Sequence, residues 1–403
     1  MSAATGPHVF MIAGEESGDR LGAALIAALR RQTQGQVRVS GIGGAHMAGE
    51  GVQSPFPLGD LAIMGFAAIP ASLPKILRRI REAADAVIAA RPDVVVIIDS
   101  PEFTHRVAKR VRARAPAIPI IDYVCPSVWA WRPGRARAMR AYVDHVLGLL
   151  PFEPAVMQRL GGPPTTFVGH PLGEQVARLR PNADEAQRRL TDPPILLVMP
   201  GSRSGEVSRM GGVFGEALAL IKRRVGALEV VVPAVPRLVE IMRATVASWP
   251  VPGRIVTDPA EKDADFRTAR AALTKSGTST LELALAGVPM VAAYKVPPVE
   301  AVVARILITA PSAILTNLIL GENVVPEFLQ QDCTAERLAE ALIPLMADTP
   351  ERRRQTNAFA RLDAIMDIGR AVPSERAAAA VLGSGGAFNQ AGRPAMASPA
   401  SRA

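Results

Sequence analysis

The sequence predicts an α/β protein built from two similar βα domains in tandem. Short runs of β-branched and aliphatic residues alternate with longer segments of helical periodicity along most of the chain. One run, residues 93–98, shows no polar alternation, which is typical of a strand buried on both faces of a parallel sheet. The alternation stops at residues 181–194, which are rich in proline and charge, and then restarts. We therefore expect two domains that face each other across a cleft, with a linker between them.

Length and composition narrow the class of protein. At 403 residues, the chain can hold two hydrophobic cores. Hydrophobic residues make up 49%, yet no apolar run approaches the ~20 residues of a membrane-spanning helix. Residues 1–8 lack the features of a secretory signal, so we expect a cytoplasmic protein. Two distant cysteines and five histidines predict neither a disulfide framework nor a metal centre.

The net charge of +9 is concentrated in the N-terminal half of the sequence. Such an excess suits nucleic acid, an anionic membrane surface or a phosphorylated substrate. Nucleic acid is the least favoured of the three partners, because aromatic residues make up only 4% and do not alternate with basic ones.

The first domain is predicted at residues 1–185 and the second at residues 186–365. Helices at residues 366–383 follow, and their return to the first domain stays open; the composition of residues 384–403 predicts a disordered tail. Predicted strands of the first domain cover residues 9–13, 37–42, 93–98, 118–124, 145–149 and 165–168. Those of the second cover residues 195–199, 229–232, 254–257, 271–274 and 289–294, and residues 316–321 are predicted as a loop.

The strongest candidate for a phosphate site is a corner in the second domain. Ser276, Gly277 and Thr278 lie where a predicted strand turns into a helix. Unpaired amides and summed peptide dipoles favour an anion at a helix start, and glycine lets the anion approach the backbone. Glu282 follows about one turn later, within reach of a ribose hydroxyl. The alternative is an ordinary turn in which Thr278 or Ser279 caps the helix.

Two corners of the first domain carry further candidates. Residues 14–19 form a glycine-rich loop with Ser17, but without the glycine order of a dinucleotide fold or the lysine of a P-loop. The strand at residues 93–98 ends in Asp99, and Glu102 lies three residues on. Because ligands collect at the carboxyl ends of parallel strands, both carboxylates are candidate general bases. Capping of the next helix is the alternative for them.

Aromatic and basic side chains follow the predicted strand at residues 118–124. Trp129, Trp131 and Arg132 lie just ahead of a helix that carries Arg135, Arg137 and Arg140. Two tryptophans beside four arginines could clamp an anionic, partly apolar ligand. The alternative for Trp129 is packing under the sheet.

An apolar loop stands beside a basic helix in the first domain. The helix at residues 72–90 has regularly spaced apolar positions and carries Arg78 and Arg79 in its first turns. It is either a core helix with a solvated basic face or an interfacial element, in which each basic residue contributes about 1 kcal/mol on anionic lipid. The loop at residues 61–69 favours the second interpretation, through the side chains of Ile63, Met64 and Phe66.

Seven segments in chain order resemble the lipid-A-disaccharide synthase family. They are Ala-Gly-Glu-Glu-Ser-Gly-Asp (13–19), Ile-Asp-Ser-Pro-Glu-Phe (98–103), Pro-Ser-Val-Trp-Ala-Trp-Arg (126–132), Leu-Pro-Phe-Glu (150–153), Phe-Val-Gly-His-Pro (167–171), Pro-Gly-Ser-Arg (200–203) and Ser-Gly-Thr-Ser-Thr-Leu-Glu (276–282). The resemblance covers most of the chain and implies a GT-B glycosyltransferase fold with two Rossmann-like domains.

This resemblance also implies the reaction. An inverting, metal-independent enzyme without a cofactor would join UDP-2,3-diacylglucosamine to 2,3-diacylglucosamine 1-phosphate (lipid X), giving a β-1,6 disaccharide 1-phosphate and UDP in lipid A biosynthesis. Both substrates carry acyl chains, so the enzyme would sit peripherally on the cytoplasmic face of the anionic inner membrane. The sequence does not decide the acyl-chain length or the oligomeric state.

Site residues carry over by position. Arg203 and the amides of residues 276–278 would stabilise the leaving diphosphate, and Glu282 would hold the ribose. In the family the second acid of the strand-end motif is an aspartate, the favoured base; here Glu102 takes its place, so the choice between Glu102 and Asp99 stays open. Asn317 matches a family Pro-Asn-Leu segment whose proline is replaced here, and we expect it to contact substrate.

Two other functions compete with this one. A UDP-sugar 2-epimerase would share the phosphate corner, but it has no need for an apolar loop beside a basic helix. A non-catalytic membrane-surface protein that binds nucleotide-sugars is the other alternative.

Overall fold

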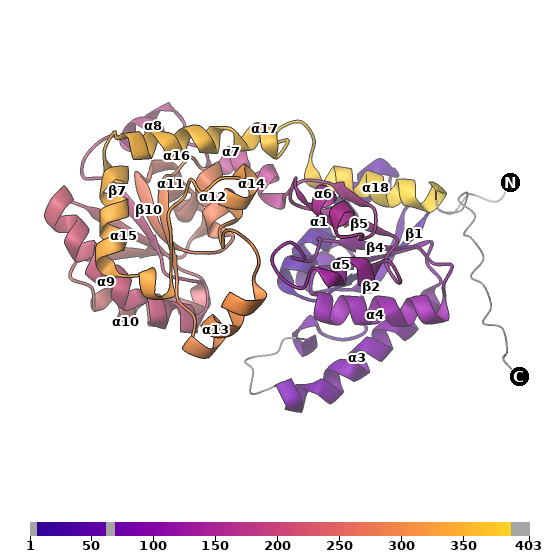
Figure 1. Ribbon diagram of the computed structural model, residues 1–403. Coiled ribbons are helices and arrows are strands. Elements are labelled where there is room, and N and C mark those ends of the chain that lie inside the picture. The colour runs from indigo at the N-terminus through magenta and orange to yellow at the C-terminus, as the bar shows by residue number, and fades with distance from the viewer. Residues whose placement is uncertain (1–5, 62–68, 388–403) are drawn as a thin grey trace, which may run out of the picture. The chain divides into compact units, whose positions relative to one another are not determined.

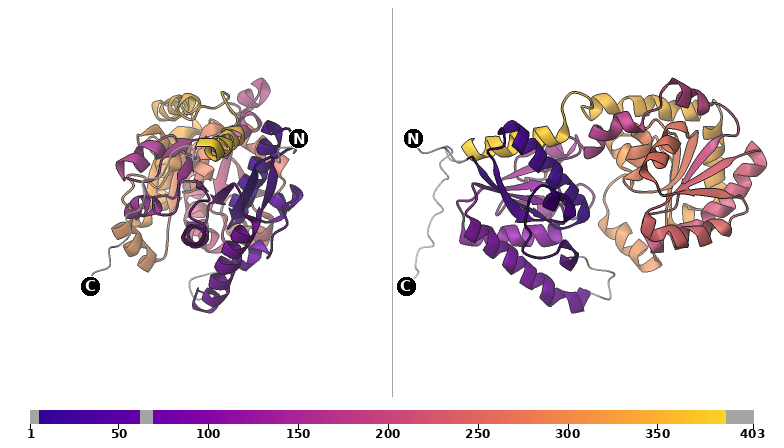
Figure 2. Two further views of the ribbon diagram at one scale, coloured as in Figure 1. Left: turned by 90° about the vertical axis from the view of Figure 1, so that its right-hand side faces the viewer. Right: turned by 180° about the vertical axis from the view of Figure 1, so that it is seen from behind.

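The computed structural model describes residues 6–61 and 69–387, and its contacts divide the chain into two units (Figure 1). Unit 1 consists of Met1–Pro171 and Ala371–Ala403, and unit 2 of Leu172–Arg370. Each unit is an α/β body with a six-stranded parallel sheet and helices on both faces (Figure 2). The predicted fold class is therefore confirmed.

The sheet of unit 1 has the strand order β2-β1-β3-β4-β5-β6. Every residue of β1 and β3 is buried. Alternate side chains of β1 enter different cores: Phe10 and Ile12 pack on one face, and Val9 and Met11 on the other. Since both faces are covered, the strand sequence needs no polar alternation. The strands are β1 (His8–Ala13), β2 (Arg38–Ile42), β3 (Val94–Ile98), β4 (Ile120–Tyr123), β5 (His145–Gly148) and β6 (Thr165–Phe167).

Helices from both ends of the chain cover this sheet. The last helix packs against α1, where Gln32 Nε2 donates to the backbone oxygen of Glu375 at 2.8 Å (Figure 1). Ala377, Ala378 and Val381 of that helix are buried in the core of unit 1. The helices of unit 1 are α1 (Glu16–Gln32), α2 (Ala45–Gly49), α3 (Ile69–Ala90), α4 (Pro101–Arg114), α5 (Gly134–Met139), α6 (Glu153–Arg159) and α18 (Pro373–Ala387).

The sheet of unit 2 has the order β12-β11-β10-β7-β8-β9. Its strands are β7 (Ile195–Met199), β8 (Glu229–Pro233), β9 (Gly253–Val256), β10 (Ala271–Lys275), β11 (Met290–Tyr294) and β12 (Glu327–Leu329). Its helices are α7 (Val176–Leu179), α8 (Ala183–Arg188), α9 (Ser204–Val225), α10 (Val239–Ala247), α11 (Pro259–Thr268), α12 (Ser279–Leu285), α13 (Pro298–Leu307), α14 (Leu315–Leu320), α15 (Ala335–Leu342), α16 (Pro350–Ala360) and α17 (Leu362–Ile365).

The segment interpreted as a linker is instead part of unit 2. Asn182 and Glu185 form a reciprocal capping box at the start of α8. The guanidinium of Arg189 then donates to the backbone oxygens of Phe266 and Ala286, at 2.9 and 2.8 Å. Asparagine and acidic residues are typical of helix caps as well as of linkers, which explains the difference. The units accordingly change after Pro171 rather than at residue 185.

Each sheet reverses its strand order once, and we call that place the switch point of the unit. In unit 1 it lies between β1 and β3, and in unit 2 between β7 and β10. Ligands of open parallel sheets bind beyond the carboxyl ends of the strands at such points. Residues 14–19 and 99–102 therefore surround the first switch point, and residues 200–203 and 276–278 the second.

A buried carboxylate ties α1 to the start of α2. Asp19 is only 1% exposed, and its Oδ1 accepts hydrogen bonds from the amides of Gly44 and Met47 at 2.7 and 3.0 Å. Its Oδ2 accepts one from the amide of His46 at 2.9 Å. The carboxylate thus satisfies three amides at the start of a short helix that would otherwise lose hydrogen bonds on burial.

We expect Asp19→Asn to lower the free energy of unfolding by about 1–3 kcal/mol, because the amide nitrogen cannot accept from a backbone amide. Urea unfolding measures the loss. The matched control is Asp85→Asn, whose carboxylate pairs with Arg114 at the surface, and which should change stability by no more than about 0.5 kcal/mol. Equal losses in the two variants would contradict the role given to Asp19.

Candidate active site

The two loops at the switch point of unit 1 are in direct contact. Ser17 Oγ donates a hydrogen bond of 2.9 Å to Asp99 Oδ2. Asp99 Oδ1 in turn accepts from the amide of Ser100 at 2.7 Å. Gly14 makes this approach possible, since a Cβ added there would lie 2.4 Å from Ser100 Cβ. Two predicted site residues, Ser17 and Asp99, are therefore brought together.

The backbone at Asp99 is strained. Asp99 and Ser100 have φ values of +53° and +48°, in the left-handed region that residues with a side chain rarely adopt. Thr104 Oγ1 holds the turn, because it donates to the backbone oxygen of Asp99 at 2.7 Å and to that of Ser100 at 3.1 Å. Such outliers cost on the order of 1–3 kcal/mol each and concentrate at functional sites. The strain fixes the Asp99 carboxylate where β3 ends.

Glu102 lies on the first turn of α4 among arginines. Arg135 Nη2 donates to its Oε1 at 2.6 Å, and Arg132 and Arg106 each lie 3.8 Å from a carboxylate oxygen. Partial burial raises the pKa of Glu102, but the hydrogen bond from Arg135 and the three positive charges outweigh it, so the pKa lies below its ordinary value. A carboxylate in this setting is a stable anion and a weak base.

The two tryptophans of residues 126–132 have different environments. Trp129 packs edge-on against Phe152, with ring centroids 5.5 Å apart, and its Nε1 donates to Glu153 Oε1 at 3.4 Å. Trp131 instead stacks with guanidinium groups, 4.3 Å from Arg132 and 5.6 Å from Arg135. Trp129 thus packs within unit 1, the alternative weighed from the sequence. Trp131, Arg132 and Arg135 all belong to the predicted clamp, and the structure brings these three side chains together.

Glu153 is a buried acid that supports the tryptophan loop. It is 3% exposed, and besides the Trp129 indole it accepts a 2.9 Å hydrogen bond from the amide of Leu150. Burial raises the pKa of Glu153 to about 7, although the hydrogen bonds from the Leu150 amide and from Trp129 lower it. This carboxyl therefore changes its charge close to neutral pH.

A second buried polar network lies between α4 and β4. His105 Nε2 lies 3.0 Å from Asp122 Oδ2, and His105 Nδ1 lies 3.1 Å from the Tyr142 hydroxyl. Burial raises the pKa of Asp122, while the charge and hydrogen bond of His105 oppose the rise. The network fixes α4, which begins with the strained turn. Sequence reasoning missed it, because the three residues are far apart in the chain.

In unit 2, a buried ion pair links the two loops of the switch point. Lys275 Nζ lies 3.1 Å from Glu206 Oε1, and Glu206 Oε2 accepts from the amides of Ser202 and Arg203 at 3.0 and 3.3 Å. Burial raises the pKa of Glu206, but the charge of Lys275 and these hydrogen bonds outweigh it and leave the pKa below its ordinary value. A Cβ at Gly201 would lie 2.4 Å from Glu206 Cβ, so glycine is needed for this contact.

The predicted phosphate corner offers free donors. In the part of the chain that the structure describes, the backbone amides of Gly277 and Thr278 have no acceptor, and the Thr278 side chain makes no capping hydrogen bond. Ser276 is mostly buried, and its hydroxyl donates to the backbone oxygen of Ala313 at 2.8 Å. The side chain of Arg203 is 77% exposed beside Glu206. These groups form a basic surface with free backbone amides at the carboxyl end of the sheet.

Glu282 and Asn317 already have partners within unit 2. Glu282 Oε1 accepts a 3.0 Å hydrogen bond from Lys262 Nζ. Asn317 is buried in α14, where the sequence predicted a loop, and its amide group bonds to the backbone of Val324 and Val325. These hydrogen bonds give Asn317 a structural role within unit 2. Contacts of Glu282 with a ribose and of Asn317 with substrate stay predictions.

The residues predicted to face lipid fall into two groups. Ile63, Met64 and Phe66 lie outside the described residues. Arg78 is 70% exposed and pairs with Glu82 at its own helix surface. Arg79 is only 19% exposed, binds Asp60 and Glu82, and lies 4.8 Å over the Phe56 ring. Arg79 therefore belongs to the packing of α3, and Arg78 is the better candidate for a lipid contact.

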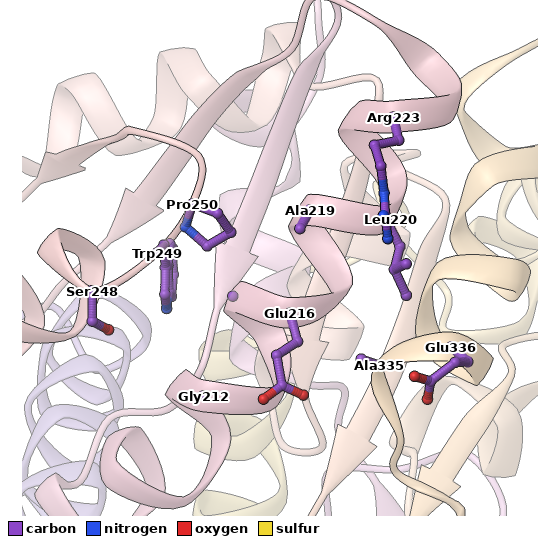
Figure 3. A pocket seen from close by; sticks show the side chains of 11 residues that line it. Gly212, Glu216, Ala219, Leu220, Arg223, Ser248, Trp249, Pro250, Ala335 and Glu336 are labelled. Carbon is purple, nitrogen blue, oxygen red and sulfur yellow. The ribbon is translucent and has the colours of Figure 1, made fainter.

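A pocket of about 500 Å³ in unit 2 is lined by α9, by the residues that follow α10 and by the start of α15 (Figure 3). It is open and holds none of the predicted site residues, so we do not assign it to the site. Its lining residues are Gly212, Gly215, Glu216, Ala219, Leu220, Arg223, Ser248, Trp249, Pro250, Ala335 and Glu336.

We expect Glu153→Gln to become more stabilising, relative to the parent protein, as pH rises from 5.5 to 8. An acid whose pKa is raised on folding binds its proton more tightly in the folded state, so stability falls as pH rises from about 4.5 and the full loss applies above about 7. That loss is at most on the order of 3 kcal/mol, and glutamine does not suffer it.

Thermal unfolding at several pH values measures this difference. The matched control is Glu240→Gln, whose side chain is 84% exposed, and which should give a difference that does not vary with pH. A pH-independent difference for Glu153→Gln would contradict the assignment of a near-neutral pKa to Glu153.

The sequence of the chain matches a known protein family along most of its length. The family model described as lipid-A-disaccharide synthetase matches residues 9–381. Lipid-A-disaccharide synthase from Nitrobacter hamburgensis is 62% identical over 375 residues, which cover 93% of this chain and 95% of that protein.

Two solved structures share the fold. MurG from Acinetobacter baumannii has a TM-score of 0.57 at 18% identity and covers 93% of this chain and 99% of its own. UDP-GlcNAc 2-epimerase from Neisseria meningitidis, bound to UDP-GlcNAc, has a TM-score of 0.57 at 11% identity and covers 94% of this chain and 99% of its own. The family match over nearly the whole length of the chain and the 62% identical relative show that the chain belongs to the lipid-A-disaccharide synthetase family.

Proposed function

We propose that this chain transfers the 2,3-diacylglucosaminyl group of UDP-2,3-diacylglucosamine to the primary hydroxyl of lipid X. The bond from the anomeric carbon to UDP breaks, the hydroxyl oxygen bonds to that carbon from the opposite face, and its proton passes to a carboxylate. The products are the β-1,6 disaccharide 1-phosphate and UDP. One observation supports the proposal most directly: in a chain of this family, the switch point of unit 1 presents the carboxylate of Asp99, whereas that of unit 2 presents basic side chains and free backbone amides.

The donor diphosphate would bind at the switch point of unit 2. The free amides of Gly277 and Thr278 are donors that an anion could accept from, and the exposed guanidinium of Arg203 adds a positive charge. These donors would stabilise the charge that grows on UDP as it leaves, without a metal. Glu282 would exchange Lys262 for the ribose hydroxyls.

The acceptor would bind at the switch point of unit 1, with Asp99 as the general base. Glu102 is less suited to this role, because Arg135 already donates to its carboxylate and Arg132 and Arg106 lie beside it. Asp99 is oriented by Ser17 and by the strained turn, and it is not shared with a guanidinium in the described residues. The 1-phosphate of lipid X would bind Arg132 and Arg135, with Glu102 keeping the guanidinium groups in place.

We expect Asp99→Asn to lower kcat by about 10²–10⁴-fold, because the amide cannot take the proton. Glu102→Gln should mainly raise the KM for lipid X, by roughly 10-fold, because one hydrogen bond that positions Arg135 is weakened. The assay contains purified protein, UDP-2,3-diacylglucosamine and detergent, with or without lipid X. It measures the UDP and the disaccharide that form. Asp85→Asn, at the surface of α3, is the control and should keep full activity.

The opposite pattern, with kcat lost in Glu102→Gln and retained in Asp99→Asn, would exclude Asp99 as the base. UDP release that does not need lipid X would exclude the transfer itself and favour an epimerase. Binding of UDP without any turnover would favour a nucleotide-sugar-binding protein.

Peripheral attachment to the inner membrane is part of the proposal. Within residues 6–61 and 69–387, no helix is both long enough and apolar enough to span a bilayer. The start of α3 supports attachment at the surface, since Leu73 and Leu77 are exposed beside Arg78. Aliphatic side chains next to a basic one fit the headgroup region of an anionic leaflet.

We expect Arg78→Gln to weaken binding to anionic vesicles by roughly 5-fold, the effect of one basic residue worth about 1 kcal/mol at the surface. Flotation at low salt measures the partition. Arg114→Gln, which removes an exposed arginine of α4, is the control. Equal partition of the parent protein with neutral and anionic vesicles would contradict an electrostatic contact by α3.

A further inference from the structure

Helix α13 of unit 2 exposes a continuous apolar stripe. Val299, Val302, Val303 and Ile306 follow the i, i+3, i+4, i+7 spacing of one helix face, and they are 77%, 62%, 48% and 74% exposed. No residue of this helix is buried. Exposed aliphatic side chains are ordinary when single, but a contiguous stripe marks a surface that binds something.

The stripe starts close to the switch point of unit 2. The chain leaves β11 at Tyr294, whose ring lies 5.0 Å from Lys275 Nζ, the lysine of the buried ion pair. The backbone oxygen of the next residue, Lys295, accepts a 3.2 Å hydrogen bond from Arg209 Nε in α9. Within unit 2, α13 lies at the edge opposite α8 and α16 (Figure 1). The segment before α13 is therefore fastened beside the proposed donor site, while the helix itself projects into solvent.

Charge and composition indicate what the stripe binds. Lys295 precedes α13, Glu300 lies in its first turn and Arg305 lies in its last turn, so the segment around the stripe carries a net positive charge. Basic residues at the rim of an aliphatic face complement anionic headgroups above acyl chains. The helix contains no aromatic residue or methionine, which are enriched where proteins bind one another.

We propose that α13 is a second lipid-contacting element, carried by unit 2, which inserts its aliphatic stripe into the surface of an anionic leaflet. This rests on the proposed function in one respect: the proposed donor carries acyl chains, so its binding site needs access to the leaflet that holds them. With α13 in the leaflet, the switch point of unit 2 lies at the lipid surface. The contact is independent of α3, which belongs to unit 1.

The test is the double variant Val302→Ser/Ile306→Ser in flotation with vesicles of phosphatidylglycerol and phosphatidylcholine. Both side chains project into solvent, so the melting temperature should not change. We expect the vesicle partition coefficient to fall by about 10-fold or more, the effect of removing two inserted aliphatic groups. Ile241→Ser, an exposed isoleucine of α10, is the matched control and should bind as the parent does.

An unchanged partition coefficient in the double variant would overturn the proposal. So would a change of oligomeric state in sedimentation without a change in vesicle binding, because the stripe would then be an interface between two copies of the chain. The UDP-release assay in detergent reports separately on the proposed function, since it needs no bilayer. If the parent protein shows no turnover but the double variant loses lipid binding, this inference stands and the proposed reaction is excluded.

Discussion

Both units depend on one constraint of parallel sheets. Where the strand order reverses, neighbouring strands send their next helices to opposite faces, so the two loops meet beyond the strand ends without a helix over them. In unit 1, α1 follows β1 onto one face and α4 follows β3 onto the other, and the loops join through Ser17 and Asp99. In unit 2, the ion pair of Glu206 and Lys275 joins the corresponding loops. Polar groups gather at these two places because the sheets leave space there.

The two switch points share this architecture but differ in chemistry. Unit 1 presents a strained aspartate with a cluster of arginines and Trp131 beside it, and unit 2 presents free amides and an exposed arginine. A sugar transfer needs both kinds of site, since one partner loses a proton and the other leaves with additional negative charge. The acids Glu153 and Glu206 are buried beneath the loops and are not exposed at the site. Their hydrogen bonds to backbone amides and to Trp129 shape these loops.

The sequence predicts the strands well because their runs of buried aliphatic residues are local signals, and the fold class and family follow from these runs and from seven ordered motifs. It does not predict which strands are neighbours, so the contact between Ser17 and Asp99 could be inferred only from the structure. Trp129 and Trp131 look equivalent in the sequence, and the difference comes from Phe152 and Glu153, which a later helix supplies. The interpretation of residues 181–194 as a linker was wrong, because cap residues and linker residues have the same composition.

Titration of UDP into two variants tests the division of chemistry most directly. If the donor diphosphate binds at the switch point of unit 2, Arg203→Gln should weaken UDP binding by about 10-fold or more, the value of a charge-assisted hydrogen bond, while Asp99→Asn should bind UDP as the parent protein does. Isothermal titration calorimetry measures both affinities without any turnover. Loss of UDP affinity in Asp99→Asn, with full affinity in Arg203→Gln, would contradict the account, because the diphosphate would then depend on unit 1.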